Sequence, residues 1–202
     1  MGIQDMKFYF CFITLLLFSS PGHTEKILLL GDSLSAAYDI SWEKGWVQLL
    51  QHEISDEHEL INASVSGETT GGGLARLPAL LEEHQPDWVI IELGGNDGLR
   101  GYPLSVIRKN LLQMGNLVQQ ANAGLIYFGI RIPANYGQRY NDAFTAIFPE
   151  VAEQLQASYL DLYIEELALD PTMMQEDKLH PTEKAQPVLK EFVKQFLLKQ
   201  IN

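Results

Sequence analysis

Short apolar runs alternate with amphipathic segments along most of this 202-residue chain, and this alternation constrains the fold more than any other feature of the sequence. Nearly continuous apolar runs are typical of strands buried on both faces, as in parallel sheets. Strand and helix in alternation predict βαβ units with right-handed crossovers. In chain order, the expected strands and helices are strand 27–30, helix 46–54, strand 60–61, helix 74–81, strand 88–93, helix 104–121, strand 125–130, helix 140–156, strand 159–163 and a last helix that begins near 184–187.

The loops after the first three predicted strands hold residues that suit acyl-transfer chemistry. Ser33 follows the first strand, Gly67 lies in the polar, Gly-rich loop after the second, and Asn96 directly follows the third. The carboxyl ends of parallel strands share one edge of the sheet, where open α/β sheets bind their ligands. A serine hydroxyl there can act as a nucleophile, a glycine N–H can point at a ligand, and an Asn amide can donate to an oxyanion. Taken alone, each residue is also compatible with an ordinary turn.

A serine nucleophile needs a base, and His180 is the candidate among the five histidines. It precedes the last helix, and Asp177 lies three residues upstream. A short turn can bring the Asp177 carboxylate to the imidazole ring, which would fix the tautomer and stabilise the imidazolium. The alternative is that both residues merely cap a helix and face solvent. The other histidines are expected in the N-terminal segment or on the solvated surface: His23, His52, His58 and His84.

Composition and motifs exclude several other classes of protein. The formal net charge of -12 argues against a nucleic-acid partner, because phosphate binding requires a basic stripe, and gives no attraction to anionic lipid. We expect no metal, because the chain has no HExxH motif and no second histidine at ligand spacing. The glycines at 71–73 are not followed by the GK[ST] of a phosphate loop, and no cofactor is expected.

The N-terminal segment is predicted to be a signal peptide. Lys7 precedes an apolar run at 8–18, which is too short to span a bilayer as a helix but suits a signal-peptide core. We expect residues 1–24 to be removed and 25–202 to form a single domain in the periplasm or outside the cell; the alternative is an uncleaved anchor. Cys11 lies inside the run, which argues against lipidation, so the mature chain has no thiol for catalysis.

Together, the four loop motifs resemble the GDSL, or SGNH, hydrolase superfamily. They occur in the family's order: Ser33 in Gly-Asp-Ser-Leu-Ser, Gly67 in Ser-Val-Ser-Gly-Glu-Thr, Asn96 in Gly-Gly-Asn-Asp, and His180 in Asp-Lys-Leu-His-Pro. The chain is most similar to the bacterial periplasmic thioesterase I group, also described as lysophospholipases and arylesterases. The similarity covers nearly all of 25–202, so the predicted domain is an SGNH hydrolase domain.

Lys178 and Asp32 each lie next to a predicted catalytic residue. Lys178 stands where the thioesterase I group usually has Gly, but the spacing of Asp177 and His180 is kept, so we expect a change in the loop rather than in the chemistry. Asp32 is expected to brace the loop beside Ser33 and is not assigned to the triad. The Gly-x-Ser-x-Gly elbow of α/β-hydrolases is absent.

The resemblance implies both a fold and a mechanism. The fold is a flavodoxin-like three-layer α/β/α sandwich whose five-stranded parallel sheet has the order 2-1-3-4-5. The activity is that of a serine hydrolase, which cleaves carboxylic esters and thioesters through an acyl-enzyme on Ser33. His180 takes the proton from Ser33 and Asp177 orients His180. The backbone N–H groups of Ser33 and Gly67 and the side-chain amide of Asn96 hold the oxyanion.

The expected partner is a small-molecule acyl ester or thioester, and we expect a monomer. A carbohydrate O-deacetylase on the same scaffold is the alternative, and it would prefer acetyl groups on sugars. A non-catalytic binding protein is less favoured, because the set of reactive residues is complete. Apolar loops at 99–104, 132–136 and 164–174 predict a groove for an acyl chain, although 164–174 can instead pack on the core.

Overall fold

A computed structural model of the chain describes residues 24–162 and 164–201, so nearly all of the predicted signal peptide lies outside the described residues. The strands and helices in chain order are β1 (Glu25–Gly31), α1 (Trp46–Ile54), β2 (His58–Asn62), α2 (Thr70–His84), β3 (Trp88–Glu92), α3 (Gly95–Leu99), α4 (Leu104–Gln120), β4 (Gly124–Gly129), α5 (Gln138–Gln154), β5 (Ser158–Asp161) and α6 (Gln186–Ile201).

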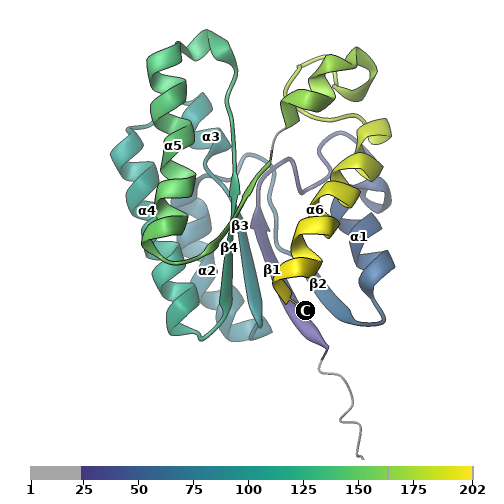
Figure 1. Cartoon of the computed structure of the whole chain (residues 1–202), viewed down its shortest axis with the longest axis vertical. Helices are drawn as coiled ribbons and strands as arrows, with labels where there is room; N and C mark the ends of the chain where they lie inside the picture. Colours follow the sequence, from purple (N-terminus) through teal and green to yellow (C-terminus); the bar gives the residue numbers. More distant parts are fainter. Residues whose placement is uncertain (1–23, 163, 202) are drawn as a thin grey trace, which may run out of the picture.

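The five strands form one parallel sheet in the order β2-β1-β3-β4-β5, which confirms the predicted fold class. The first strand lies inside the sheet: Leu28 pairs with Ile61 of β2 on one side and with Val89 of β3 on the other. Helices α1 and α6 cover one face, and α2, α4 and α5 cover the other (Figure 1). The chain therefore forms a three-layer α/β/α sandwich.

The central strand β1 contributes to two separate hydrophobic cores. Leu28 and Leu30 pack under α2 and α4, whereas Ile27 and Leu29 pack under α1 and α6. Successive side chains of a strand point to opposite faces, so a strand covered by helices on both sides needs an apolar residue at every position. This requirement explains the unbroken apolar run of the first strand.

Helix α2 begins earlier than its apolar spacing predicts. We expected a helix from residue 74 after a glycine-rich loop, but the helix includes the three glycines and starts at Thr70. Thr69 caps it, because its hydroxyl accepts the N–H of Gly72 at 3.2 Å. A Cβ at Gly73 would lie 2.2 Å from a methyl group of Leu93, the residue after β3, so close packing here explains a residue of low helix propensity.

Other differences concern helix ends and one histidine. Pro149 was expected to bend or interrupt its helix, and α5 is not interrupted at this residue. Gly124 was expected to end the preceding helix and instead begins β4, while Asn122 takes the left-handed conformation after α4 (φ 60°). His58 was predicted on the surface, and this was wrong: it begins β2 and is buried.

The segment predicted to be irregular, 164–174, forms two short 3-10 turns at Ile164–Leu169 and Pro171–Met173. Across the described ranges 24–162 and 164–201, we find no helix with both the length and the apolar character that a membrane crossing requires.

Truncation of the Phe144 side chain on α5 tests the hydrophobic core. Phe144 is fully buried and packs edge-to-face on Phe148 at a centroid distance of 5.2 Å. We expect Phe144→Ala to lower the free energy of unfolding by about 3–5 kcal/mol, because it removes a large apolar side chain and leaves a cavity. Phe192 on α6 is 44% exposed, so Phe192→Ala should cost about 0.5 kcal/mol. Urea denaturation measures both values, and equal losses would contradict this account of the core.

Candidate active site

The nucleophile loop begins at Gly31, where β1 ends, and the first turn is tight. The carbonyl of Asp32 accepts the N–H of Ala36 at 3.0 Å, and the carbonyl of Ser33 accepts the N–H of Tyr38 at 3.3 Å. A Cβ at Gly31 would lie 2.6 Å from the carboxylate oxygen Oε2 of Glu92. The glycine at this position therefore leaves room for the Glu92 carboxyl. Ser33 follows two residues later and is half-buried at the carboxyl edge of the sheet.

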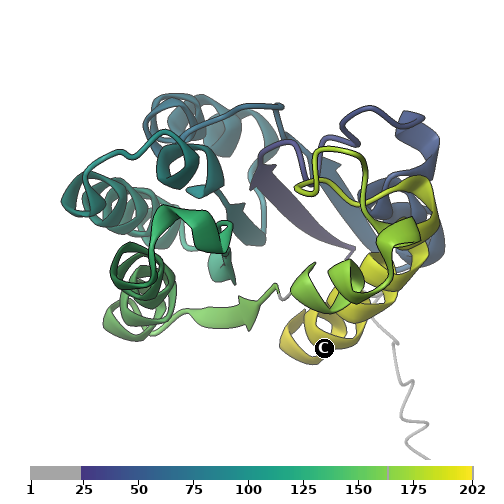
Figure 2. The same cartoon turned by 90° about the horizontal axis from the view of Figure 1, so that it is seen from above.

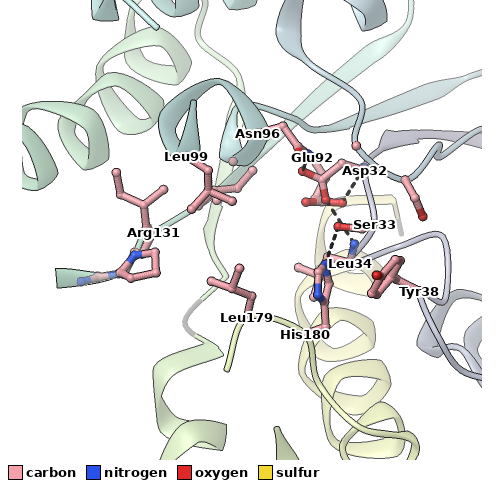
Figure 3. A pocket seen from close by; sticks show the side chains of 16 residues that line it. Asp32, Ser33, Leu34, Tyr38, Glu92, Asn96, Leu99, Arg131, Leu179 and His180 are labelled. Atoms are coloured by element: carbon pink, nitrogen blue, oxygen red, sulfur yellow. Dashed lines mark hydrogen bonds between the residues drawn. The ribbon is translucent and has the colours of Figure 1, made fainter. Parts of the chain in front are cut away.

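The structure brings Ser33, His180 and Asp177 into one chain of hydrogen bonds. His180 Nε2 lies 2.7 Å from Ser33 Oγ (Figure 3). His180 Nδ1 lies 2.6 Å from Asp177 Oδ2. The two sequence segments are 147 residues apart and meet only in the fold. The ring of Tyr38 lies against His180 with centroids 4.4 Å apart, so the imidazole is held by packing as well as by hydrogen bonds.

A tight turn between Asp177 and His180 makes this arrangement possible. Asp177 Oδ1 accepts the backbone N–H of Leu179 at 2.9 Å and that of His180 at 3.0 Å. Lys178 takes the left-handed conformation at φ 58°, which a glycine would adopt at lower cost. Lys178 is therefore compatible with the turn that places the carboxylate beside the ring.

The surroundings of the Asp177 carboxyl favour its ionised form. Burial acts to raise its pKa, but hydrogen bonds from the His180 ring and from the backbone N–H groups of Leu179 and His180 outweigh burial, so the pKa is lowered. At neutral pH the group is a carboxylate that accepts the imidazole N–H.

The predicted oxyanion residues lie on the other side of Ser33. Gly67 follows β2 with φ 79°, in the left-handed region that suits glycine, and its carbonyl accepts a guanidinium N–H of Arg100 at 3.2 Å. Asn96 lies in the first turn of α3, a short helix where we expected a loop. Ser33, Gly67, Asn96 and His180 all line one cavity of about 270 Å³.

A buried hydrogen-bond network fixes α3, and with it Asn96. The carboxylate of Asp97 accepts the Thr70 backbone N–H at 2.8 Å and the Thr70 hydroxyl at 2.6 Å. The side chain of Asn110 donates to that hydroxyl oxygen at 3.0 Å. These bonds join α2, α3 and α4 directly behind the cavity.

Two carboxyl groups beneath Ser33 complete the site. Asp32, predicted to brace the loop, accepts the backbone N–H of Leu34 at 3.1 Å and the side-chain N–H of Asn96 at 3.0 Å. Glu92 ends β3 and accepts the hydroxyl of Ser35 at 2.8 Å. Sequence reasoning missed Glu92; the available signal was a single acidic residue in an otherwise apolar strand that is buried on both faces.

Burial dominates the electrostatics of these two groups. It raises the pKa of Asp32 to about 6, although hydrogen bonds from Leu34, Glu92 and Asn96 and the charge of His180 oppose the shift. Burial also raises the pKa of Glu92 well above its usual range, and the neighbouring charge of Asp32 adds to this effect.

A second cavity of about 160 Å³ adjoins the first and shares six lining residues with it. Its own residues include Leu162, Ala168 and Met174, so part of the segment after β5 faces this cavity. Leu167 in the same segment packs on the core instead. Among residues 24–162 and 164–201, no group of three or more His, Cys, Asp or Glu side chains is arranged to hold a metal ion.

Comparison with known proteins agrees with this geometry. The sequence is 45% identical to an arylesterase of Vibrio mimicus over 98% of both chains, and 45% identical to thioesterase 1/protease 1/lysophospholipase L1 of Escherichia coli K12 over 95% of this chain and 90% of that protein.

Among solved structures, the psychrotrophic esterase EstA from Pseudoalteromonas sp., inhibited by monoethylphosphonate, matches with a TM-score of 0.85 and 45% identity, covering 88% of this chain and 99% of EstA. The sequence model of the GDSL-like Lipase/Acylhydrolase family matches residues 29–186. With near full-length relatives at 45% identity and a family match over most of its length, this chain belongs to the GDSL-like lipase/acylhydrolase family.

Proposed function

We propose that this chain is a serine hydrolase that cleaves carboxylic esters and thioesters through an acyl-enzyme on Ser33. One observation carries the proposal: a serine hydroxyl lies 2.7 Å from a histidine nitrogen whose other nitrogen lies 2.6 Å from a carboxylate, at the mouth of a cavity. The membership of the family and the activities named for the relatives support the same reaction.

In the proposed mechanism, His180 Nε2 takes the hydroxyl proton as Ser33 Oγ attacks the acyl carbon. The negative charge that develops on the carbonyl oxygen is met by the backbone N–H groups of Ser33 and Gly67 and by the side-chain amide of Asn96. His180 returns the proton to the leaving thiol or alcohol as the bond to the acyl carbon breaks. Water then attacks the acyl-enzyme with the same proton transfers and releases the acid.

The two cavities support a substrate with an acyl chain. The first opens at Ser33, and the side chains of Leu99 and Leu179 line it together with the reactive residues (Figure 3). Ile132 also lines this cavity. The second continues past the shared residues toward Met174. Clefts lined mainly by apolar side chains bind apolar ligand groups, so we propose that the acyl chain extends from Ser33 into the second cavity.

This lining also bears on the alternatives. A carbohydrate O-deacetylase needs polar groups around a sugar and only a small acetyl pocket, so an apolar path that extends beyond the first cavity favours longer acyl chains. A binding protein without catalysis would have no need of a hydrogen-bonded Ser33, His180 and Asp177.

We also propose that residues 1–24 are a signal peptide, that the enzyme acts in the periplasm or outside the cell, and that 25–202 form a single monomeric domain. The sheet begins at Glu25, so cleavage before this residue would leave every strand intact. Glu25 itself belongs to the sheet, because it pairs with His58 of β2.

Replacement of the nucleophile tests the proposal directly. We expect Ser33→Ala to leave a folded protein whose kcat on a chromogenic short-chain ester falls by several orders of magnitude, because no covalent intermediate can form. A fluorophosphonate probe should label the wild-type protein and not the variant. Turnover near the wild-type rate, or labelling of the variant, would refute the assignment of Ser33.

Replacement of Asp177 tests the role of the carboxylate. Asp177→Asn removes the anion that fixes the His180 tautomer, and kcat should fall by about 10⁴ by analogy with other triads. Asp142→Asn, an exposed aspartate on α5, serves as the matched control and should change nothing. Equal activities of the two variants would exclude Asp177 from the mechanism.

A series of acyl esters tests the path of the chain. Turnover should rise from acetyl toward medium-length chains as more apolar surface is buried in the second cavity. Ala168→Phe should fill part of this cavity and lower kcat/KM for the longer esters while leaving acetyl ester hydrolysis unchanged. Equal rates from acetyl to palmitoyl would argue against an acyl path.

A further inference from the structure

We propose that Glu92 and Asp32 form a carboxyl pair that shares one proton beneath the nucleophile loop, with the proton on Glu92, and that this pair positions the amide of Asn96. Neither group belongs to the triad, and both act through their neighbours as positioning residues. Their effect on turnover rests on the proposed serine hydrolase function, whereas the shared proton can be measured without it.

The site around Glu92 is built to hold its side chain. Glu92 is 1% exposed, and its Oε2 accepts the Ser35 hydroxyl at 2.8 Å and the backbone N–H of Asp32 at 3.2 Å. Glu92 is the strand partner of Gly31, and the missing side chain at Gly31 provides the space that Oε2 occupies. The carboxyl therefore connects the end of β3 to the residues on both sides of Ser33.

Ionisation of both Asp32 and Glu92 at the same time would carry a large free-energy cost. Asp32 is 6% exposed, and Glu92 Oε2 accepts its backbone N–H at 3.2 Å, so the two buried acidic residues are in direct contact. Among the described residues, no Lys or Arg is recorded in an ion pair with either group; the ionisable group that acts on Asp32 apart from Glu92 is His180. Two like charges in contact inside a protein retain a proton between them. Glu92 is the more deeply buried group, and Asp32 faces His180, so the proton belongs on Glu92.

An ionised Asp32 determines which way the Asn96 amide points. A carboxylate only accepts hydrogen bonds, so its Oδ2 must face the NH₂ end of the Asn96 side chain, at 3.0 Å. The reversed amide would place its carbonyl oxygen against the carboxylate. One N–H of Asn96 is thus used by Asp32, and the other is left for an oxyanion in the cavity that Asn96 lines. Leu34 holds the second carboxylate oxygen of Asp32 through its N–H at 3.1 Å.

The total charge of the pair matters for the same reason. A single negative charge at Asp32 favours the imidazolium that forms on His180, consistent with the attraction between these two groups. A second charge at Glu92 would oppose the oxyanion that forms next to Asn96. A neutral Glu92 supplies a hydrogen-bond donor to Asp32 and an acceptor for Ser35 without adding that charge.

Two substitutions at Glu92 separate shape from charge. Glu92→Gln keeps the neutral donor and acceptor, so kcat at neutral pH should stay within about twofold of wild type. Glu92→Met has a similar size but cannot accept from Ser35 or donate to Asp32, and kcat should fall roughly 10-fold to 100-fold with little change in KM, as expected for a misplaced reacting group. Glu59→Gln, an exposed glutamate on β2, is the control and should match wild type.

Two further measurements do not depend on catalysis. Infrared difference spectra at neutral pH should show the carbonyl stretch of a protonated carboxylic acid in wild type and in Ser33→Ala, and this band should be missing in Glu92→Gln. Because folding raises the pKa of Glu92, the folded protein binds the extra proton, and wild-type stability falls as pH rises above the unfolded value. The Tm of Glu92→Gln relative to wild type should therefore increase from about pH 5 to about pH 8.

The outcomes distinguish the two proposals. A Glu92→Met enzyme with wild-type kcat would overturn the positioning role, and equal losses in Glu92→Gln and Glu92→Met would show that the ionised carboxylate is required. An absent acid band in the folded wild-type protein would overturn the shared proton. If Ser33→Ala remained active while the band and the Tm trend were present, the assigned nucleophile would be wrong and the carboxyl pair would stand.

Discussion

Burial of a parallel sheet on both faces is the constraint on which the rest of this structure depends. Helices cover each side of β1 and β3, so the strands leave no polar surface between their ends. Polar chemistry is consequently confined to the loops, and a parallel arrangement places the loops after β1, β2 and β3 at one edge (Figure 2). The same burial makes an ionised Glu92, the fully buried acidic side chain at the end of β3, costly, and this carboxyl must be neutralised or paired.

The site uses carboxyl groups in two different environments. Asp177 is partly exposed and receives several hydrogen bonds, so its pKa is lowered and it remains an anion beside the imidazole. Asp32 and Glu92 lie below the nucleophile loop, where burial raises both pKa values. One carboxylate thus faces His180 from the solvent side, while the inner pair keeps its charge low near the proposed oxyanion site. This division follows from the balance between burial, which raises a carboxyl pKa, and hydrogen bonds to the carboxylate, which lower it.

Much of the architecture could be predicted from local patterns. Apolar runs located all five strands, and the spacing at 46–54 matched α1 completely, because periodicity reports which faces are buried. Patterns failed where a distant contact decided the conformation. The three glycines at the start of α2 were expected in a loop, and the turn around Asn96 proved to be a short helix. His58 lies in a polar local sequence, but it begins β2 and its side chain is buried.

The amino-acid sequence by itself determined the strand order, through its resemblance to a family, and the identities of the residues that meet at the site. Each of Ser33, Gly67, Asn96, Asp177 and His180 stands in a short motif that can be read locally. Only the tertiary structure decided that Glu92 approaches Asp32, because that contact joins residues 60 positions apart through a gap left by Gly31. Protonation depends on such contacts and on burial, and neither is a property of the local sequence.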